Sequence, residues 1–410
     1  MTLKTVYIQT FGCQMNTADS AEMMLALSAR GCISCQNAQK ADVMLINTCT
    51  IREHAEHKAL SLLGRLRKWK EAKFGRVIIF AGCAAERLGG EVKKKFPHVD
   101  IVCGAKSIDA FDKIIEASGL FGGAPAGAEP PAESSPIALV NIMRGCSCKC
   151  SYCIVPYVRG EASSLDFDEV LKNIQAKLDA GAKEIVLLGQ TVNAYNYKGK
   201  NFAALLKEAV KLNGLDRLRY LSPHPLFITE EVAEVMATEP KIAKHLHLPV
   251  QSGSSKVLKE MKRGYSREEF LSKISLLKKG GIWVSTDIIV GYPTETEEDF
   301  KETLTLVDEC NFSGAYCFKF SPRMGTPAFS LKELPVNIVE KRLDILLNKV
   351  KLNAKAAYKA QEGTIQRVLM ESPHNGRTLS NFWVRTEKPY KTGDAVELTI
   401  KKAEESILLA

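Results

Sequence analysis

The sequence has no run of about 18 consecutive apolar residues, the length that a helix needs to cross a membrane. Its N-terminal segment also lacks the charged and apolar regions of a secretory signal peptide, and it leads directly into a pattern typical of a β-strand. We therefore expect a soluble protein of the cytoplasm that has no membrane partner.

A disulfide framework is also excluded, although the chain contains 12 cysteines. A cytosolic compartment keeps thiols reduced, so metal or cluster ligation is the better explanation for at least some of them. The seven histidines are scattered. Only His245 and His247 alternate on one expected strand, and they have no obvious third ligand. We interpret this pair as ordinary polar residues near the mouth of a barrel.

Positively charged residues only moderately outnumber negatively charged ones. The net charge of +9 and the pI near 8.8 favour a polyanionic partner, but weakly. A chain of 410 residues with 45% hydrophobic residues has enough material for two or three domains and more than one core.

The most informative stretch contains Cys146, Cys150 and Cys153, spaced Cys-x3-Cys-x2-Cys. Three thiolates at this spacing suit an iron–sulfur cluster, because cysteine sulfur is the preferred ligand of such clusters. A four-iron cubane needs four ligands, so one iron is left open. A zinc site would more commonly repeat Cys-x2-Cys pairs, and a ferredoxin cluster would need a fourth cysteine nearby. Cys148 is the only other thiol there, and its neighbours crowd it away from a separate cluster.

This arrangement resembles the signature of the radical S-adenosylmethionine (SAM) superfamily. In that superfamily the amino and carboxylate groups of SAM bind the open iron. Tyr152 matches the aromatic residue that usually precedes the last cysteine of the signature, and the resemblance implies that it lies at the cofactor.

Residues 1–118 repeat one pattern, in which a β-branched strand is followed by a cysteine and then by a helix. The repeats place Cys13, Cys49 and Cys83 directly after three successive strands. Alternation of strands and helices predicts an open parallel sheet with helices on both faces, and ligands bind such sheets beyond the carboxyl ends of the strands. The expected strands are 6–10, 42–47, 77–81 and 99–102.

We expect these three cysteines to converge and to hold a second cluster. The N-termini of the helices that follow them would favour the negative charge of a cluster. The alternative is that cysteine simply packs well at strand ends, but three such positions in register favour the cluster. Cys32 and Cys35 are expected at the opposite end of the sheet, where we interpret them as incidental, and Cys103 is expected to be a buried free thiol.

An expected helix over residues 52–76 carries eight basic and three acidic residues. Most of this charge points away from a helical apolar face formed by Ala59, Leu62, Leu63 and Leu66. The two interpretations, a solvated surface and a contact with RNA phosphates, are about equally favoured.

Residues 119–136 are small and rich in Pro and Gly, which predicts a linker. The strand–helix alternation then resumes over 137–361. Six units imply a partial (β/α)6 barrel, with the cluster loop on the top face where such barrels do their chemistry. The expected strands are 139–143, 184–188, 217–221, 245–250, 283–290 and 314–320, and the expected helices include 166–179, 267–279, 297–309 and 336–361.

Several strand ends of this barrel are rich in Gly and Pro, which let the backbone turn closely over a ligand. Together they resemble the SAM-binding segments of the radical SAM barrel. The resemblance implies that Gly189 and Gln190 lie near the methionine part of SAM, and that Ser222 and Gln251 are polar contacts.

Residues 362–410 read as short strands and turns after a long helix, and they resemble a TRAM domain, a small β-barrel known for RNA binding. From residue 363 on, the chain contains seven basic and six acidic residues. The expectation of RNA binding by this module therefore depends on resemblance and not on charge.

The three parts in this order resemble the radical SAM methylthiotransferase family. The most similar branch is that of the tRNA-2-methylthio-N6-dimethylallyladenosine synthases, which the chain resembles in FGCQMN (residues 11–16), NTCTIRE (47–53) and CIVPYVRG (153–160). The branches that act on threonylcarbamoyl-adenosine in tRNA or on an aspartate of a ribosomal protein depart from these motifs. Cys148, where a polar residue that is not a ligand is usual, and the short C-terminal module depart from the family pattern.

The resemblance implies methylthiolation of C2 of N6-isopentenyl-adenosine beside the anticodon of tRNA. An aromatic C–H has no acid–base handle, so a cofactor must supply a radical. The cluster of Cys146, Cys150 and Cys153 would generate it from one SAM, and the other cluster would deliver a sulfur methylated by a second SAM. An electron donor such as flavodoxin or ferredoxin is implied, as is a sulfur or cluster donor.

Two hypotheses of other classes remain open. A non-catalytic RNA-binding iron–sulfur protein would bind tRNA without consuming SAM. A cluster-based electron carrier would show reversible redox chemistry without affinity for RNA, and it would leave the segments at the barrel mouth unexplained.

Overall fold

The computed structural model describes residues 4–51, 53–122 and 135–410. The chain divides into two compact units. The first unit is formed by Met1–Ala132 together with Ile154–Glu161, and the second by Glu133–Cys153 together with Ala162–Ala410.

A five-stranded parallel sheet forms the centre of the first unit. Its strand order is β2-β1-β3-β4-β5, and every pair of neighbours is parallel. The strands are β1 (Thr5–Phe11), β2 (Ile33–Ser34), β3 (Val43–Thr48), β4 (Val77–Gly82) and β5 (Ile101–Gly104). The open parallel sheet expected from the sequence is confirmed, and edge strand β2 is an addition to it.

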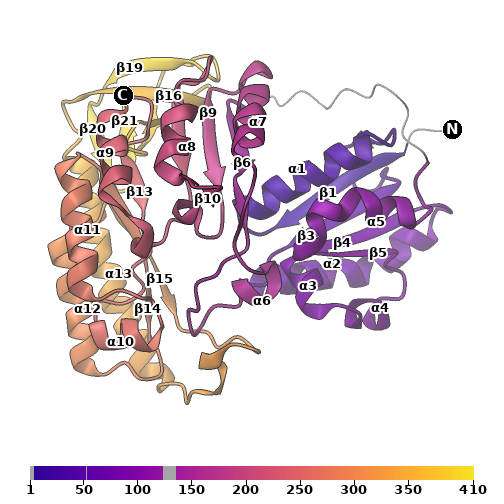
Figure 1. The fold of residues 1–410 in the computed structure, drawn as a ribbon, viewed down its shortest axis with the longest axis horizontal. Coiled ribbons are helices and arrows are strands. Elements are labelled where there is room, and N and C mark those ends of the chain that lie inside the picture. The colour runs from indigo at the N-terminus through magenta and orange to yellow at the C-terminus, as the bar shows by residue number, and fades with distance from the viewer. Residues whose placement is uncertain (1–3, 52, 123–134) are drawn as a thin grey trace. The chain divides into compact units, whose positions relative to one another are not determined.

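Helices cover both faces of this sheet (Figure 1). On one face α1 (Gln14–Ser28) and α5 (Phe111–Ala117) pack on the strands through Leu27 and Phe111. On the other face α2 (Glu53–Glu71), α3 (Cys83–Leu88) and α4 (Glu91–Lys95) pack through Leu63 and Val92. Strands β3 and β4 are buried along their whole length, which explains why their sequences are almost continuously apolar.

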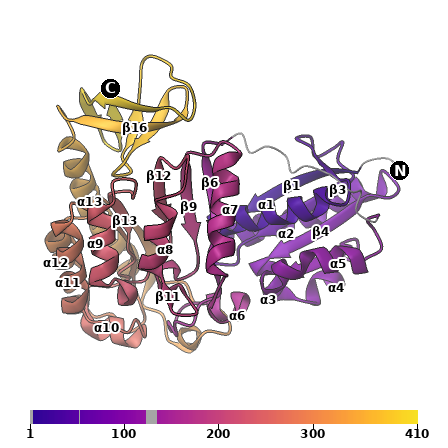
Figure 2. The same cartoon turned by 45° about the horizontal axis from the view of Figure 1, so that its top comes forward.

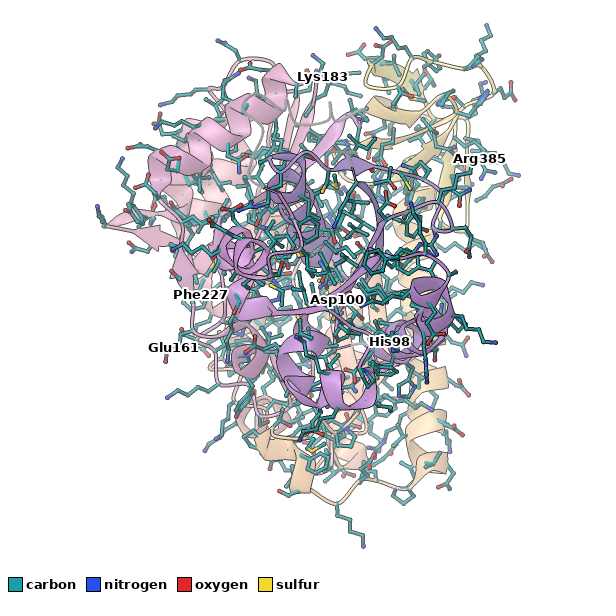
Figure 3. The ribbon with its side chains drawn as sticks, turned by 90° about the vertical axis from the view of Figure 1, so that its right-hand side faces the viewer. His98, Asp100, Glu161, Lys183, Phe227 and Arg385 are labelled. Carbon is teal, nitrogen blue, oxygen red and sulfur yellow. The ribbon has the colours of Figure 1, made fainter. Side chains whose placement is uncertain are left out.

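The basic helix α2 is shorter than expected. It ends at Glu71, because the chain turns at Gly75, whose φ of +81° suits glycine. Lys70 on its last turn pairs with Asp100 and donates to the carbonyl of His98 at 2.8 Å, so this charge is bound within the unit (Figure 3 labels His98 and Asp100). The remaining cations of the helix are exposed, namely Lys58, Arg65, Arg67 and Lys68.

The segment 154–161 packs with the first unit, although the sequence assigned it to the barrel. Its helix α6 (Val155–Arg159) buries Val158, which together with Ile154 contacts Cys83 and Ala105. The segment runs directly on from Cys153 and ends at Glu161, labelled in Figure 3.

Six parallel strands form the partial barrel of the second unit, which confirms the expected (β/α)6 fold. They lie in sequence order in two groups of three, and a single parallel bridge between Leu218 and Ile242 connects the groups. The strands are β6 (Ile137–Asn141), β9 (Glu184–Leu188), β12 (Arg217–Tyr220), β13 (His245–His247), β14 (Trp283–Val290) and β15 (Gly314–Lys319).

Helices that start at conventional caps cover the outside of the barrel. Asp166, Thr229 and Ser266, for example, each accept a hydrogen bond from the first turn of the helix that they precede. The helices are α7 (Phe167–Asp179), α8 (Phe202–Ala209), α9 (Glu230–Thr238), α10 (Ser255–Glu260), α11 (Arg267–Lys279), α12 (Glu297–Cys310) and α13 (Val336–Lys359).

Shorter elements complete the mouth region of the barrel. Two small hairpins are formed by β7 with β8 and by β10 with β11, and single turns of 3-10 helix follow several barrel strands. These elements are β7 (Met143–Arg144), β8 (Ser163–Ser164), β10 (Asn196–Tyr197), β11 (Lys200–Asn201), η2 (Val192–Ala194), η3 (Pro225–Phe227) and η4 (Pro327–Ser330). In the first unit, η1 (Ala105–Ala110) follows β5.

A six-stranded sheet follows α13 at the C-terminus, as Figure 2 shows in yellow. Trp283 of the barrel packs edge-on against Phe382 of this module, with ring centroids 5.2 Å apart. Arg217 at the start of β12 donates to the carbonyls of Arg377 and Thr378, at 2.9 Å each. The strands are β16 (Ile365–Ser372), β17 (Asn375–Thr378), β18 (Trp383–Arg385), β19 (Ala395–Thr399), β20 (Lys402–Glu404) and β21 (Ile407–Leu409).

The domain limits 1–118, 137–361 and 362–410 stay predictions, because the barrel and the C-terminal sheet belong to one compact unit. Most of the predicted linker 119–136 lies outside the described residues. Among the helices that the structure describes, none combines the length and the apolar character needed to cross a membrane.

Candidate cluster and cofactor sites

The register of the first sheet brings Cys13, Cys49 and Cys83 to one edge. Phe11, Thr48 and Gly82 are direct neighbours across β1, β3 and β4. Each cysteine follows one of these residues within two positions. The N–H of Cys49 also donates to the carbonyl of Phe11 at 2.8 Å, which ties the ends of two strands together.

The three sulfurs lie close enough to perturb one another. The thiols of Cys13 and Cys49 share a hydrogen bond, and so do those of Cys49 and Cys83. The pKa of Cys13 is raised by its contact with Cys49 and by burial. The pKa of Cys83 is lowered, chiefly because it accepts the hydrogen bond of Cys49 and also because a guanidinium lies beside it. The expected convergence is therefore present in the structure.

Buried amides hold the turns that carry these cysteines. Asn16 donates to the Oδ1 of Asn47 at 3.1 Å, and Asn47 returns a bond to the carbonyl of Asn16 at 2.8 Å. Gly82 has φ +93°, and a Cβ there would clash with the side chain of Asn47 and lie 2.7 Å from the carbonyl oxygen of Thr48. Glycine is thus required directly before Cys83, both for its φ and for space.

Arg159 contacts a sulfur of this trio, which the spacing of the cysteines does not predict. Its Nε donates to the Sγ of Cys83 at 3.2 Å, and its Nη2 lies 2.8 Å from the Oδ2 of Asp19. The side chains of Arg159 and Asp19 are 5% and 0% exposed. A buried cation on one sulfur favours the thiolate form that a cluster ligand needs. The only signal in the sequence was that Arg159 belongs to the motif CIVPYVRG.

The second trio of thiols lies on the loop after β7. Cys146 and Cys150 are buried, whereas Cys148 and Cys153 are half-buried. The hydroxyl of Thr191 lies 3.1 Å from the Sγ of Cys146. The N–H of Cys153 donates to the carbonyl of Cys150 at 3.1 Å and closes the turn between these two cysteines.

The buried guanidinium of Arg263 donates a hydrogen bond to a sulfur of the second trio. Arg263 donates from Nη1 to the Sγ of Cys150 at 3.3 Å, and from Nη2 to the carbonyl of Pro249 at 2.9 Å. The hydrogen bond from Cys148, together with Thr191 and Arg263, lowers the pKa of Cys146 to about 6. The same contact raises the pKa of Cys148. Cys148 therefore donates to the sulfur of Cys146, and its assignment as a residue that is not a ligand stays a prediction.

Tyr152 lies within the apolar cluster that supports this loop. It packs beside Tyr292 and Phe320, and Arg263 approaches its hydroxyl at 3.5 Å. Burial raises its pKa. Neighbouring Ser151 bonds to the hydroxyl of Tyr292 at 3.0 Å, so the loop is attached to the segment that follows β14.

The four other predicted SAM residues all lie at strand ends of the barrel, with different surroundings. The Oε1 of Gln190 is buried and has no hydrogen-bond partner among the described residues, which suits a ligand contact. Ser222 and Gln251 have φ of +61° and +77°, a conformation that non-glycine residues adopt at a cost and that clusters at functional sites. Gly189 packs tightly instead, because a Cβ there would lie 2.5 Å from Met143.

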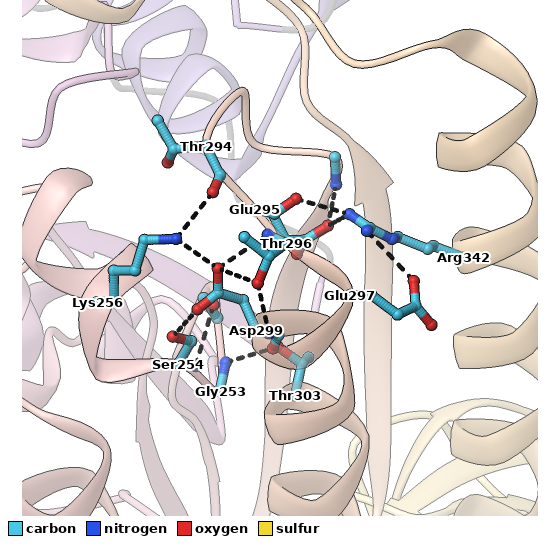
Figure 4. Close-up of polar contacts among 12 residues, drawn as sticks. Gly253, Ser254, Lys256, Thr294, Glu295, Thr296, Glu297, Asp299, Thr303 and Arg342 are labelled. Carbon is cyan, nitrogen blue, oxygen red and sulfur yellow. Dashed lines mark hydrogen bonds and ion pairs between the residues drawn. The ribbon is translucent and has the colours of Figure 1, made fainter.

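A polar network fixes the loop after β14 (Figure 4). The buried carboxylate of Glu295 accepts from the N–H of Gly291 and from Arg342, at 2.8 Å each. Asp299 at the start of α12 accepts from Ser254 at 2.6 Å and pairs with Lys256 at 2.8 Å. The network ties the segment 291–296 to α10 and α13.

Cys103, the segment of Cys32 and Cys35, and the pair of His245 and His247 have structural surroundings. Cys103 is fully buried on β5, where burial raises its pKa to about 12. Ile33 and Ser34, between Cys32 and Cys35, pair with the first residues of β1, at the end of the sheet opposite Cys13. His245 and His247 both contact the hydroxyl of Ser285, at 3.0 and 2.9 Å. The expectation that this pair lies near the mouth is wrong for His245, because it begins β13 and lies 3.4 Å from Asn381 of the C-terminal sheet.

Two family models match the chain. The model described as "Radical SAM superfamily" matches residues 140–307, and the model described as "Uncharacterized protein family UPF0004" matches residues 5–104. Curated relatives match almost the whole length. A tRNA-2-methylthio-N(6)-dimethylallyladenosine synthase of Endomicrobium trichonymphae is 38% identical and covers 97% of each chain, and one of Polynucleobacter necessarius is 42% identical over 90% of this chain and 87% of the relative.

The chain belongs to this radical SAM methylthiotransferase family. Members of the family are enzymes that use SAM and [4Fe-4S] clusters. Solved structures with only 13% identity share the fold. The radical SAM methyltransferase TsrM of Kitasatospora setae matches with a TM-score of 0.58 over 80% of this chain and 77% of TsrM, and OxsB with 0.52 over 85% and 56%.

The residues present fit two clusters. Within the described part of the chain no three His, Cys, Asp or Glu side chains are grouped to hold a single metal ion. The two trios instead offer sulfur only, the donor set that iron–sulfur clusters take. Each trio also has one arginine directed at a sulfur, which offsets the negative charge of bound thiolates.

Proposed function

We propose that the protein replaces the C2 hydrogen of N6-isopentenyl-adenosine, next to the anticodon of tRNA, by a methylthio group. The proposal assigns to this chain the reaction for which its relatives are named. Transfer RNA is then the macromolecular partner, and the cytoplasm is the compartment in which enzyme and substrate meet. The net charge of +9 agrees with a polyanionic partner.

One observation carries the proposal: the chain holds two separate trios of thiols, one at the carboxyl ends of three parallel strands of the first sheet and one on the loop after β7 in the second unit. In this assignment Cys146, Cys150 and Cys153 bind one cluster, and Cys13, Cys49 and Cys83 bind the other. When bound, the first cluster supplies the radical from SAM and the second supplies the sulfur. A cluster-based electron carrier would not need the strand-end segments of the barrel that resemble SAM-binding segments.

The chain's own residues hold these groups in place. Thr191 and Arg263 direct hydrogen bonds at the sulfurs of Cys146 and Cys150, and Arg159 does so at Cys83. The unpaired Oε1 of Gln190 is an acceptor for an N–H of the amino group of SAM. Gly189 serves this site only by its close packing on Met143.

Backbone and aromatic groups complete the SAM pocket in this proposal. Ser222 and Gln251, both held at positive φ, lie at the strand ends beside SAM, and Tyr152 forms part of the wall next to Cys153. The reaction also consumes one electron for each radical and one sulfur for each product. A flavodoxin or ferredoxin is therefore the proposed electron donor, and a sulfur or cluster donor restores the second site.

The assignment is tested by two cysteine substitutions in the anaerobically reconstituted protein. Cys150→Ala abolishes reductive cleavage of SAM, whereas Cys49→Ala retains cleavage and loses thiolation. Equal loss of cleavage in both variants contradicts the division of roles.

The substrate is tested by mass spectrometry of tRNA nucleosides from cells that lack the protein. The expected result is loss of the 2-methylthio form, with N6-isopentenyl-adenosine accumulating in its place. Loss of methylthiolated threonylcarbamoyl-adenosine instead would assign the protein to another branch, and unchanged nucleosides would exclude a tRNA substrate.

A further inference from the structure

A cavity of about 260 Å³ opens beside the Cys-x3-Cys-x2-Cys loop in the second unit. Its walls come from that loop and from the segments after β9, β12 and α10, and include Cys148, Lys149, His224, Phe227 and Lys262. None of the proposed cluster ligands lines it, and neither does any of the proposed SAM residues. Thr191 and Arg263, which contact the sulfurs of Cys146 and Cys150, also line it, so the cavity lies directly beside the proposed cluster without containing its ligands.

His224 presents an unused donor in this wall. The residue is 7% exposed, and its Nε2 is buried without a partner among the described residues. Its Nδ1 accepts from the N–H of Leu226 at 3.2 Å. Burial and the neighbouring Arg263 lower the pKa of His224 to about 3, so the ring is neutral. A neutral imidazole whose Nδ1 accepts carries its proton on Nε2, so His224 offers a hydrogen-bond donor.

The surrounding residues hold this donor in a fixed position. Asn193 makes two hydrogen bonds to the backbone of His224, at 2.8 and 3.0 Å. The imidazole also packs edge-on against Tyr265, with ring centroids 5.7 Å apart. A fixed and buried donor without a partner is costly unless something binds to it.

The charged groups of the wall are all cationic. Lys149, Lys262 and Arg263 line the cavity, and no carboxylate does among the described residues. Arg263 is engaged with Cys150 and Pro249. The ammonium groups of Lys149 and Lys262 have no ion-pair partner within the described part of the chain, and both residues are exposed. Lys262 also has φ +55°, a conformation that costs energy in lysine.

An apolar surface completes the cavity. Leu226 is 48% exposed, and Phe227, labelled in Figure 3, lies beside it on η3. Free cations, one neutral donor and an apolar surface with an aromatic ring are together the features that bind a nucleotide of a single strand, through its phosphate, a base acceptor and a base face.

We propose that this cavity binds one nucleotide of the substrate RNA. The Nε2–H of His224 donates to an acceptor of the base, the base lies against Leu226 and Phe227, and Lys149 and Lys262 contact the adjoining phosphates. This inference rests on the proposed function, because it assumes that RNA is the substrate.

The test measures binding of a fluorescently labelled anticodon stem-loop RNA to the reconstituted full chain at several salt concentrations. His224→Asn retains an acceptor at the position of Nδ1 and removes the Nε2 donor. Lys262→Gln removes one free charge. Lys279→Gln, at the exposed end of α11, is the matched control.

We expect Lys262→Gln to reduce the slope of log K against log salt by about 0.7, the value for one phosphate contact on a single strand. His224→Asn should weaken binding about 2- to 10-fold without changing the slope, because the lost donor is neutral. Lys279→Gln should bind like the unsubstituted protein.

Two results overturn the assignment of the cavity alone. In the first, the unsubstituted protein binds the RNA and both cavity variants bind it like Lys279→Gln, so that neither side chain contacts the RNA. In the second, the cavity variants lose affinity for SAM but not for RNA, which would make the cavity part of the cofactor site. If the unsubstituted protein does not bind the RNA at all, the proposed function fails together with the cavity.

Discussion

The buried pair of Arg159 and Asp19 should contribute strongly to the stability of the first unit. Both side chains are almost completely buried, and the guanidinium also donates to Cys83. Replacing one member of a buried pair typically costs about 3–5 kcal/mol, because the remaining charge stays in a medium of low polarity. Arg159→Met should therefore raise the opening equilibrium of this unit by about 100- to 5,000-fold.

Hydrogen–deuterium exchange of the cluster-free protein measures this effect separately for each unit. Peptides from the central strands β3 and β4 exchange only when the first unit opens, so their exchange rates report its stability. Arg159→Met should accelerate them strongly. Peptides from the barrel strands should exchange as before, because the pair lies outside the second unit.

Two further variants separate the electrostatic cause from other effects. Arg67→Met removes an exposed partner of Glu71, with side chains 71% and 63% exposed, and should cost less than about 0.5 kcal/mol. Combining Arg159→Met with Asp19→Asn should recover part of the loss, because the buried charge is then removed as well. If Arg159→Met exchanged no faster than Arg67→Met, segment 154–161 would not be held in the first unit in solution, and the buried pair would not stabilise that unit.

Three shorter predictions concern glycine, pH and the proposed barrel cluster. Gly82→Ala should lower the stability of the first unit, measured by urea denaturation, and its iron content after reconstitution. Gly75→Ala, at φ +81° but with no neighbour within 4 Å, should cost only the backbone strain of about 1–2 kcal/mol. Equal effects of the two substitutions would refute the clash with Asn47. Folding lowers the pKa of His224 from its ordinary value to about 3, so between about pH 6.5 and pH 3 the unfolded chain binds a proton that the folded chain does not. The free energy of unfolding should therefore fall by up to about 1.4 kcal/mol for each pH unit as the pH is lowered through this range. His224→Asn should flatten this dependence in urea titrations, and an unchanged slope would show that the ring titrates normally. Thr191→Val should lower the reduction potential of the cluster at Cys146 by about 20–60 mV in an EPR-monitored titration, because one hydrogen bond of about 0.5–1.5 kcal/mol to a ligand sulfur is lost; no shift would exclude that bond in the loaded enzyme.

Local patterns in the sequence were sufficient to predict the elements that carry the chemistry. Strand, cysteine and helix follow one another three times, and parallel pairing alone then brings Cys13, Cys49 and Cys83 to one edge. The same reasoning gave the six barrel strands, mostly within two residues of their observed bounds. Such predictions succeed because periodicity and strand ends are properties of contiguous residues.

Residues that act through distant contacts were not predictable in this way. Arg159 reaches Cys83 across 76 positions, and Arg263 reaches Cys150 across 113. His224 lies just after barrel strand β12, and its unused Nε2 becomes visible only when the partner of Nδ1 is known. Periodicity does not encode such contacts, because they depend on how whole elements pack.

The excursion of residues 154–161 into the first unit has a consequence for dissecting the protein. A cut anywhere in the stretch around residue 125 would not release two independent pieces, because the chain crosses between the units again on either side of α6. A gene fragment ending at residue 118 would encode a unit that lacks Val158 and Arg159, and thus exposes Ala105 and the sulfur of Cys83 to water. A separate peptide that contains α6 should therefore cover Ala105 and Cys83 again when it is added to such a fragment.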